Sequence, residues 1–256
     1  MRKSMSHTLS ADDIINYMEL MRNEEQRTIL MRFFKTGKGE YGYGDQFLGI
    51  KVPQTREVVK HSADLPISEI PKLLINKYHE VRLCGFLLLV NLFEKQSTKR
   101  LADDTDAISK RDAIVSLYLK YSTYANNWDL VDLSAPKILG KWLMLPTNLG
   151  KQVDIIDKLA QSNNLWQQRM SMVCTWTPSH NADAQWCLRY ATMHIQHTHD
   201  LMHKAVGWML REMGKGCGVE LLRQFLQQHL PIMSRTTLRY AIEKLPEEER
   251  KMWLRK

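Results

Sequence analysis

Apolar residues recur at three- and four-residue spacing along nearly the whole chain. The spacing is clear in "IINYMELM" from Ile14, in "VRLCGFLLLVNLF" from Val81 and in "AVGWMLREM" from Ala205. Residues three and four apart lie on one face of an α-helix, so each segment predicts a helix with one buried face. Alternating strand patterns are almost absent. The sequence therefore predicts an all-α fold.

Residues that favour helix N-termini stand before several of these segments. The predicted N-caps are Asn127, Ser162 or Asn163, Asp200 and Ser234. Proline has no backbone N–H to donate, so we expect the helix that begins near Asn127 to kink or restart at Pro136.

A basic residue precedes a small or apolar helical segment at regular intervals. Arg169, Lys204 and Arg239 follow one another at 35-residue spacing, and Arg82 heads an earlier copy of the pattern. This period, with two helices per unit, predicts a curved HEAT-like solenoid formed as a single domain over residues 1–256. Basic side chains repeated on a concave face could follow the phosphates of a nucleic acid. Alternatively, each cation stabilises its own repeat through nearby carboxylates or carbonyls, and the sequence leaves both open.

The composition is that of a soluble globular protein, because 44% of the 256 residues are apolar and 25% are charged. The net charge of +8 favours an anionic partner without requiring one. The longest apolar run, "LCGFLLLV", is too short to cross a membrane, and the basic N-terminus lacks the apolar region of a signal peptide. Four cysteines without paired spacing are typical of buried thiols in a reducing compartment. We therefore expect a cytoplasmic protein with no membrane partner.

One long irregular segment interrupts the helices, "KTGKGEYGYGDQFLGIKVPQTR" at residues 35–56. Its glycines do not follow a strand, which argues against a nucleotide-binding loop. Long loops in compact domains are often functional, and its tyrosines, Tyr41 and Tyr43, could stack on bases or sugars if exposed. The step from Val52 to Pro53 predicts the start of a new helix.

Four histidines lie close together in "HIQHTHDLMH", at positions 194, 197, 199 and 203. Their spacing could gather metal ligands on one helical face. No carboxylate–histidine metalloenzyme motif accompanies them, and we expect neither a metal nor a cofactor.

The segment "NNWDLVDLSAP" places two aspartates and a tryptophan at the start of a helix. Trp128 and Asp132 are four residues apart and share a face. Asp129 lies in the first turn, where a carboxylate favours the helix dipole, so we assign it a capping role. Asp132 remains the candidate for chemistry, although such a pair is often only structural.

A later helix carries a basic–aromatic–basic stripe, formed by Lys204, Trp208 and Arg211 at positions i, i+4 and i+7. Trp166 and Arg169 likewise share a face, three residues apart. Tryptophans usually pack in cores. Even so, several repeats that each offer an aromatic ring or a cation exceed what core packing requires.

Several of these blocks, in order, closely resemble the AlkD-type DNA alkylation-repair family of HEAT-like-repeat DNA glycosylases. The matching stretches are "GEYGYGDQFLGIKVPQTR", "NNWDLVD", "LWQQRMSMV", "HKAVGWMLRE" and "SRTTLRYAIEKLP". The resemblance covers nearly the whole chain. It departs from the family's usual form at "MSRTTLRYAIEK", where a serine replaces a proline before the last matched helix.

The resemblance implies a role for each matched position. Trp128 and Asp132 fall on the family's catalytic tryptophan and aspartate, and Arg169 falls on its active-site arginine. Trp208 falls on a second sugar-facing tryptophan, and Tyr41 on a tyrosine near the lesion. Lys204, Arg211 and Arg239 join Arg169 and Tyr41 as expected DNA-binding residues.

The implied activity is excision of cationic N3- or N7-alkylated purines from duplex DNA without flipping of the base. No dimerisation heptads are visible in the sequence, so we expect a monomer. Asp132 would stabilise an oxocarbenium-like sugar. Two alternatives stay open: a catalytically silent HEAT-repeat protein that binds distorted DNA, and a protein-interaction scaffold.

Overall fold

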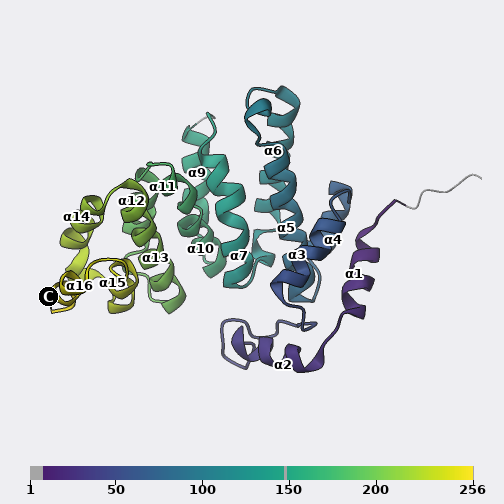
Figure 1. The fold of residues 1–256 in the computed structure, drawn as a ribbon, viewed down its shortest axis with the longest axis horizontal. Helices are drawn as coiled ribbons and strands as arrows, with labels where there is room; N and C mark the ends of the chain where they lie inside the picture. Colours follow the sequence, from purple (N-terminus) through teal and green to yellow (C-terminus); the bar gives the residue numbers. More distant parts are fainter. Residues whose placement is uncertain (1–7, 147–148, 256) are drawn as a thin grey trace, which may run out of the picture. The chain divides into compact units, whose positions relative to one another are not determined.

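The computed structural model describes residues 8–146 and 149–255, and these residues form helices joined by turns and loops (Figure 1). No strand occurs within the described ranges, where an isolated β-bridge joins Gln46 and Tyr78. The predicted all-α, helical-repeat fold is confirmed.

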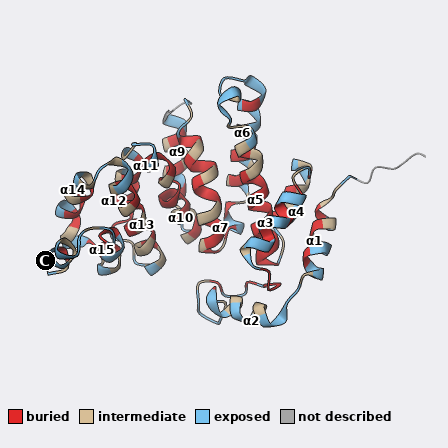
Figure 2. Cartoon of the chain, in the orientation of Figure 1, coloured by how far each residue is buried: buried red, intermediate tan, exposed pale blue. Residues whose placement is uncertain are grey.

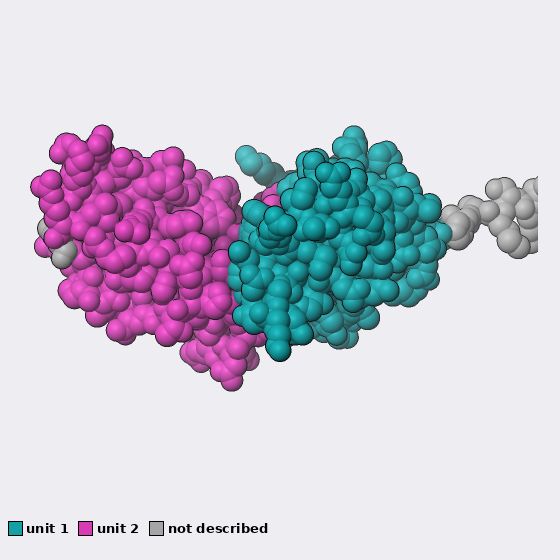
Figure 3. Space-filling view, turned by 90° about the horizontal axis from the view of Figure 1, so that it is seen from below, with its two compact units in different colours: residues 1–130 teal, residues 131–256 magenta. Residues whose placement is uncertain are grey.

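The chain divides into two compact units, residues 1–130 and 131–256 (Figure 3). The division falls inside helix α7. A single curved domain over residues 1–256 stays a prediction. The described helices of the first unit are α1 (Ala11–Leu20), α2 (Glu24–Phe33), α3 (Val52–His61), η1 (Ile67–Glu69), α4 (Ile70–Leu74), α5 (His79–Lys95), η2 (Lys99–Leu101), α6 (Thr105–Lys120) and η3 (Ser122–Tyr124).

The second unit begins within α7 (Trp128–Ala135) and ends with the chain. Its further described helices are η4 (Pro136–Gly140), α8 (Lys141–Leu143), α9 (Leu149–Ala160), α10 (Leu165–Val173), α11 (Trp176–His180), α12 (Gln185–His194), α13 (Asp200–Cys217), α14 (Val219–His229), η5 (Leu230–Ile232), α15 (Arg235–Ala241) and α16 (Glu247–Arg255).

Each unit is built around one central helix (Figure 2). In the first unit, α5 contacts α3, α4 and α6, and residues 79–90 are all buried. A helix that is apolar on nearly every side is stable only when other elements surround it. The segment "VRLCGFLLLVNLF" in α5 is such a helix. In the second unit, α13 contacts α10, α11, α12, α14 and α15. No described helix is both long and apolar enough to cross a bilayer.

The 35-residue spacing corresponds to packed helices in the second unit. Arg169 lies on α10, Lys204 on α13 and Arg239 on α15, and α13 contacts both of the others. Gly207 permits the close approach of α15, because a Cβ there would lie 2.4 Å from the carbonyl oxygen of Thr237. The HEAT-like assignment of these repeats stays a prediction.

Two predicted helix starts are confirmed and two are shifted. The side chain of Asn127 accepts a hydrogen bond from Trp128 N (2.9 Å), and Ser234 accepts one from Thr237 N (3.1 Å), so Ser234 caps α15. The predictions at Ser162 or Asn163 and at Asp200 are wrong. Asn164 caps α10, and the ring of His199 caps α13, of which Asp200 is the first residue. A polar run offers several possible caps, and the packing of the helix selects one.

The interruption expected at Pro136 is confirmed. Helix α7 ends at Ala135 and a π-helical turn, η4, follows. Thr177 Oγ donates a hydrogen bond to the carbonyl of Pro136 (2.6 Å), which ties this turn to α11. The π-helical turn is consistent with the missing N–H and the bulk of the proline ring.

The cysteines are free thiols, and Cys84, Cys174 and Cys187 are buried as predicted, whereas Cys217 is half-buried. Burial raises the pKa of Cys84 and of Cys187 to about 12, so both thiols stay protonated near neutral pH.

Candidate active site

Asp132 and Arg169 form a two-point ion pair in the second unit. Helix α7 carries the aspartate and α10 carries the arginine. Nε of Arg169 donates to Oδ1 of Asp132 and Nη2 donates to Oδ2, both at 2.8 Å. Nη1 of Arg169 donates to the carbonyl of Leu201 at 2.6 Å, which fixes the guanidinium from its other side. The sequence placed both residues in the site, but it did not predict that they bind each other.

The pair presents an oriented anion. The side chain of Asp132 is 15% exposed, whereas that of Arg169 is 6% exposed, so the carboxylate is the more accessible partner. An ionised carboxylate accepts two parallel hydrogen bonds from a guanidinium, and the adjacent positive charge favours that ionised form. Asp132 is therefore held as a carboxylate in one orientation, which suits it to stabilise a nearby positive charge.

The same contacts bear on Arg169 as a phosphate ligand. Each of its three guanidinium nitrogens already donates one hydrogen bond within the protein, and the residue is only 5% exposed. A phosphate would therefore have to displace part of this arrangement. The geometry favours a role for Arg169 in positioning Asp132.

The three residues of the stripe predicted on α13 differ in burial and in their partners. Lys204 Nζ lies 2.8 Å from a carboxylate oxygen of Asp200, in an ion pair that is partly exposed to solvent. Trp208 is half-buried. Arg211 is 16% exposed and pairs with Glu212 and Glu243, which supports a structural role.

Arg239 also belongs to the predicted DNA-binding set. It is exposed on α15. No ion pair to Arg239 occurs among the described residues, so its charge is the most accessible of the predicted DNA-binding arginines.

Trp128 belongs to an aromatic cluster in the first unit. Its ring stacks on Phe34, with centroids 5.3 Å apart, and meets Phe33 edge-on at 5.8 Å. The indole is half-buried, so it is held by these rings while it remains accessible. Trp128 and Asp132 belong to the same helix, α7, one turn apart as the sequence predicted.

Asp129 does not cap its helix through a backbone contact. It is buried, and its Oδ2 accepts a hydrogen bond from Nε2 of His79 at 2.8 Å, while Asn127 caps the helix. Nδ1 of His79 lies 3.0 Å from Oδ2 of Asp45. Asp129 thus lies in the first turn of α7 as predicted, but the capping hydrogen bond comes from Asn127, and the Asp129 carboxylate binds His79.

The imidazole of His79 is held in its charged form. Burial lowers the pKa of His79, but Asp129 and Asp45 raise it by more, to about 9. Donors from His79 and Arg82 likewise keep the pKa of Asp45 low despite its burial. His79 was not singled out from the sequence, and the only local signal was its place at the start of a buried helix, in "HEVR".

Arg82, the first residue of the predicted repeat, is structural. It is buried and donates to Asp45 Oδ1 at 2.6 Å and to the carbonyl of Asn76 at 2.8 Å. Of the two alternatives for the repeated basic residues, Arg82 therefore supports stabilisation of its own repeat rather than contact with phosphates.

The loop at residues 35–56 is anchored by the first turn of α5. The carboxylate of Glu80 accepts hydrogen bonds from three successive backbone N–H groups of the loop, those of Leu48, Gly49 and Ile50, at 2.8–3.1 Å. Tyr43 is exposed and Tyr41 is half-buried, so stacking on bases or sugars is sterically open to Tyr43 and in part to Tyr41. The predicted helix start at Val52–Pro53 is confirmed by α3.

The four histidines at 194–203 each have a protein partner. His194 bonds to Ser171, His197 to Gln168 and His203 to the carbonyl of His197. Burial lowers the pKa of His194 to about 4. Among the described residues, no group of three or more metal-ligating side chains is placed to hold a metal ion.

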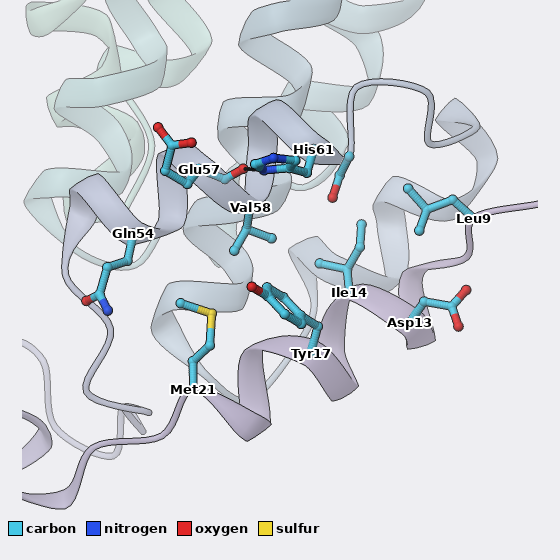
Figure 4. Close-up of a pocket in the computed structure, with 10 residues that line it drawn as sticks. Leu9, Asp13, Ile14, Tyr17, Met21, Gln54, Glu57, Val58 and His61 are labelled. Carbon is cyan, nitrogen blue, oxygen red and sulfur yellow. Dashed lines mark hydrogen bonds between the residues drawn. The ribbon is translucent and has the colours of Figure 1, made fainter.

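A pocket of about 480 Å³ opens between α1 and α3 in the first unit. Figure 4 shows Ile14, Tyr17, Met21 and Val58 turned toward the pocket between the two helices. The described residues that line it include none of the predicted site residues. The pocket is therefore a feature of the N-terminal helices, separate from the candidate site.

The fold and the site together define a helical-repeat protein whose buried arginine orients a partly exposed carboxylate. The family model described as "DNA alkylation repair enzyme" matches residues 14–245. The chain belongs to this family, as its motifs predicted, and the family supports a role in the repair of alkylated DNA.

The fold is also similar to a solved structure, described as a predicted DNA alkylation repair enzyme from Enterococcus faecalis. The TM-score is 0.65 at 16% identity, over 88% of this chain and 97% of that chain. At this identity the likeness concerns the fold alone. No curated protein matches the sequence.

Proposed function

We propose that the protein is a DNA glycosylase that releases cationic N3- or N7-alkylated purines from duplex DNA. The observation that carries the proposal is the ionised, partly exposed Asp132, held in one orientation by Arg169. Membership of the DNA alkylation repair enzyme family supports DNA as the partner.

Alkylation at N3 or N7 gives the purine a positive charge, which makes it a good leaving group without protonation. The deoxyribose becomes oxocarbenium-like as the glycosidic bond lengthens, and the Asp132 carboxylate supplies the opposite charge. It also accepts a hydrogen bond from the attacking water. Arg169 holds the carboxylate so that it needs no reorganisation during the reaction.

The indoles of Trp128 and Trp208 would present π-faces to the cationic sugar. Such contacts are worth roughly 0.5–2 kcal/mol each. A tenfold rate change corresponds to about 1.4 kcal/mol, so each ring supplies at most about one and a half decades. Asp132 must therefore contribute more than either ring.

The carboxylate nearest to Asp132 in sequence supports a mechanism without a general acid. Asp129 is buried and bonded to His79, so it is not available to protonate a leaving base. We therefore propose that only bases that already carry a positive charge are released, and that they stay largely stacked while Tyr41, Lys204 and Arg239 contact the DNA.

The test measures the rate at which free base is released from a duplex that contains N7-methylguanine. The reaction is run under single-turnover conditions, and the released base is quantified by chromatography. Wild-type protein should release the base faster than the base is lost spontaneously from the duplex without protein. Asp132→Asn should not exceed that spontaneous rate. A duplex with guanine at the same position is the substrate control. Equal release with and without protein would overturn the proposal.

A second candidate function is binding of damaged DNA without chemistry. The ion pair itself favours it, because a carboxylate neutralised by a guanidinium is also a common structural feature. The same experiment separates the two: such a protein binds the lesion duplex and releases no base.

A further inference from the structure

His79 lies at the centre of a buried charge cluster in the first unit. Its two ring nitrogens contact the carboxylates of Asp45 (3.0 Å) and Asp129 (2.8 Å), and Arg82 contacts Asp45 from the other side (2.6 Å). A neutral imidazole has one N–H, so it can donate to only one carboxylate. With both carboxyl groups ionised, the ring must therefore be an imidazolium, and the cations of His79 and Arg82 then balance the two carboxylates.

An aromatic stack connects this cation to Trp128. The ring of Phe34 lies 4.9 Å from the His79 ring and 5.3 Å from the indole of Trp128, measured between centroids. Phe47 stacks on His79 at 4.5 Å. A second connection runs through the backbone, because the carboxylate that His79 binds belongs to Asp129, the residue next to Trp128.

The backbone at Phe34 is closely surrounded by neighbouring atoms. Asn127 Nδ2 donates to the carbonyl of Phe34 (3.4 Å), and a Cβ at Gly42 would lie 2.4 Å from the same carbonyl. The other charged neighbour on α5, Glu80, is bonded to the backbone of residues 48–50. A change in the His79 contacts would therefore pass to the Phe34 ring and to the first turn of α7.

We propose that His79 is a positioning residue of the reaction: clamped between Asp45 and Asp129, it sets the position of the Trp128 indole. This rests on the proposed glycosylase function, in which Trp128 faces the sugar. Since His79 acts through Trp128, its loss cannot cost more than the loss of that indole.

The test is a double-mutant cycle on the rate of N7-methylguanine release, measured per folded molecule. The variants are His79→Gln, Trp128→Leu and the double variant, and His229→Gln is the control for loss of a buried histidine at another place in the fold. His79→Gln and Trp128→Leu should each slow release by about twofold to thirtyfold. In the Trp128→Leu background, His79→Gln should have no further effect. The inference would be overturned if the rate loss of the double variant were the product of the losses of the two single variants, or if His79→Gln kept full activity.

A second measurement needs no variant of His79. In the free wild-type protein, NMR follows the ring nitrogens of His79 and the indole N–H of Trp128, assigned by its loss in Trp128→Leu, as the pH rises through 9. Both signals should shift over the same pH range. If the Trp128 indole signal does not shift while His79 titrates, the inference is overturned, even if His79→Gln fails to fold. Absence of base release by wild type would instead overturn the proposed function, and the titration would still show whether His79 controls the indole.

Discussion

The guanidinium of Arg169 binds both carboxylate oxygens of Asp132, at 2.8 Å each, and it reaches the carbonyl of Leu201 with its third nitrogen. A residue that the sequence assigned to DNA contact thus serves the candidate catalytic residue. The predictions for these two positions follow from this arrangement.

Asp132→Asn should slow base release by roughly a hundredfold to a thousandfold, as loss of a preorganised electrostatic contact does. DNA affinity should change little or tighten, because the variant removes a negative charge and no phosphate contact. Single-turnover release and titration with a lesion duplex measure the two effects. Asp129→Asn is the matched control and should cost less activity than Asp132→Asn. A larger loss for Asp129→Asn would identify Asp129, not Asp132, as the catalytic carboxylate.

Arg169→Lys keeps the positive charge but cannot make the two parallel hydrogen bonds to Asp132. We expect base release to fall while the slope of log affinity against log salt stays unchanged. A drop of about one in that slope for Arg169→Ala would show instead that Arg169 contacts a phosphate.

Alanine at the other predicted DNA-binding cations should separate accessible from structural charges. Arg239→Ala and Lys204→Ala should each reduce the salt slope of DNA binding by up to about one, because these side chains are at least partly exposed. Arg211→Ala should leave the slope unchanged and lower stability, because Arg211 pairs with Glu212 and Glu243. Unchanged slopes in all three variants would support structural roles throughout.

Stability should depend on pH through His79. Its folded-state pKa of about 9 lies above the ordinary value of 6.5, so the stabilisation is fully present below about pH 6.5 and is lost as the pH rises through 9. The free energy of unfolding by urea, measured from pH 6 to 9.5, should fall by a few kcal/mol from this group. His79→Gln should be less stable at pH 6 and should lack most of this dependence. An equal pH dependence in the variant would contradict the assignment.

The lesion range should follow the charge of the base. N3- and N7-alkylated purines should be released, whereas uracil and 1,N6-ethenoadenine should not, because no acid is assigned to protonate a neutral leaving base. Larger alkyl groups should be tolerated, because a stacked lesion need not fit a closed pocket. Chromatography of the bases released from matched duplexes checks this. Efficient uracil release that requires Asp132 would reveal an acid or a flipping pocket.

Local sequence determined the helices and the position of the candidate residues. The three- and four-residue spacing of apolar residues, the interruption at Pro136 and the caps at Asn127 and Ser234 depend on neighbours within one or two turns. The one-turn spacing of Trp128 and Asp132 on α7 is equally local. Family membership is also a property of the sequence, since the family model matches residues 14–245.

Only the tertiary structure decided which charges meet. Asp129 binds His79, 50 residues away, and Asp132 binds Arg169, 37 residues away. Two aspartates three residues apart look alike in sequence, but burial forces each carboxylate to find its own donor. Those donors arrive on other helices, α5 and α10, whose approach depends on core packing. The apolar periodicity of a helix does not predict which other helices pack against it. The different roles of Asp129 and Asp132 are therefore set by the tertiary fold.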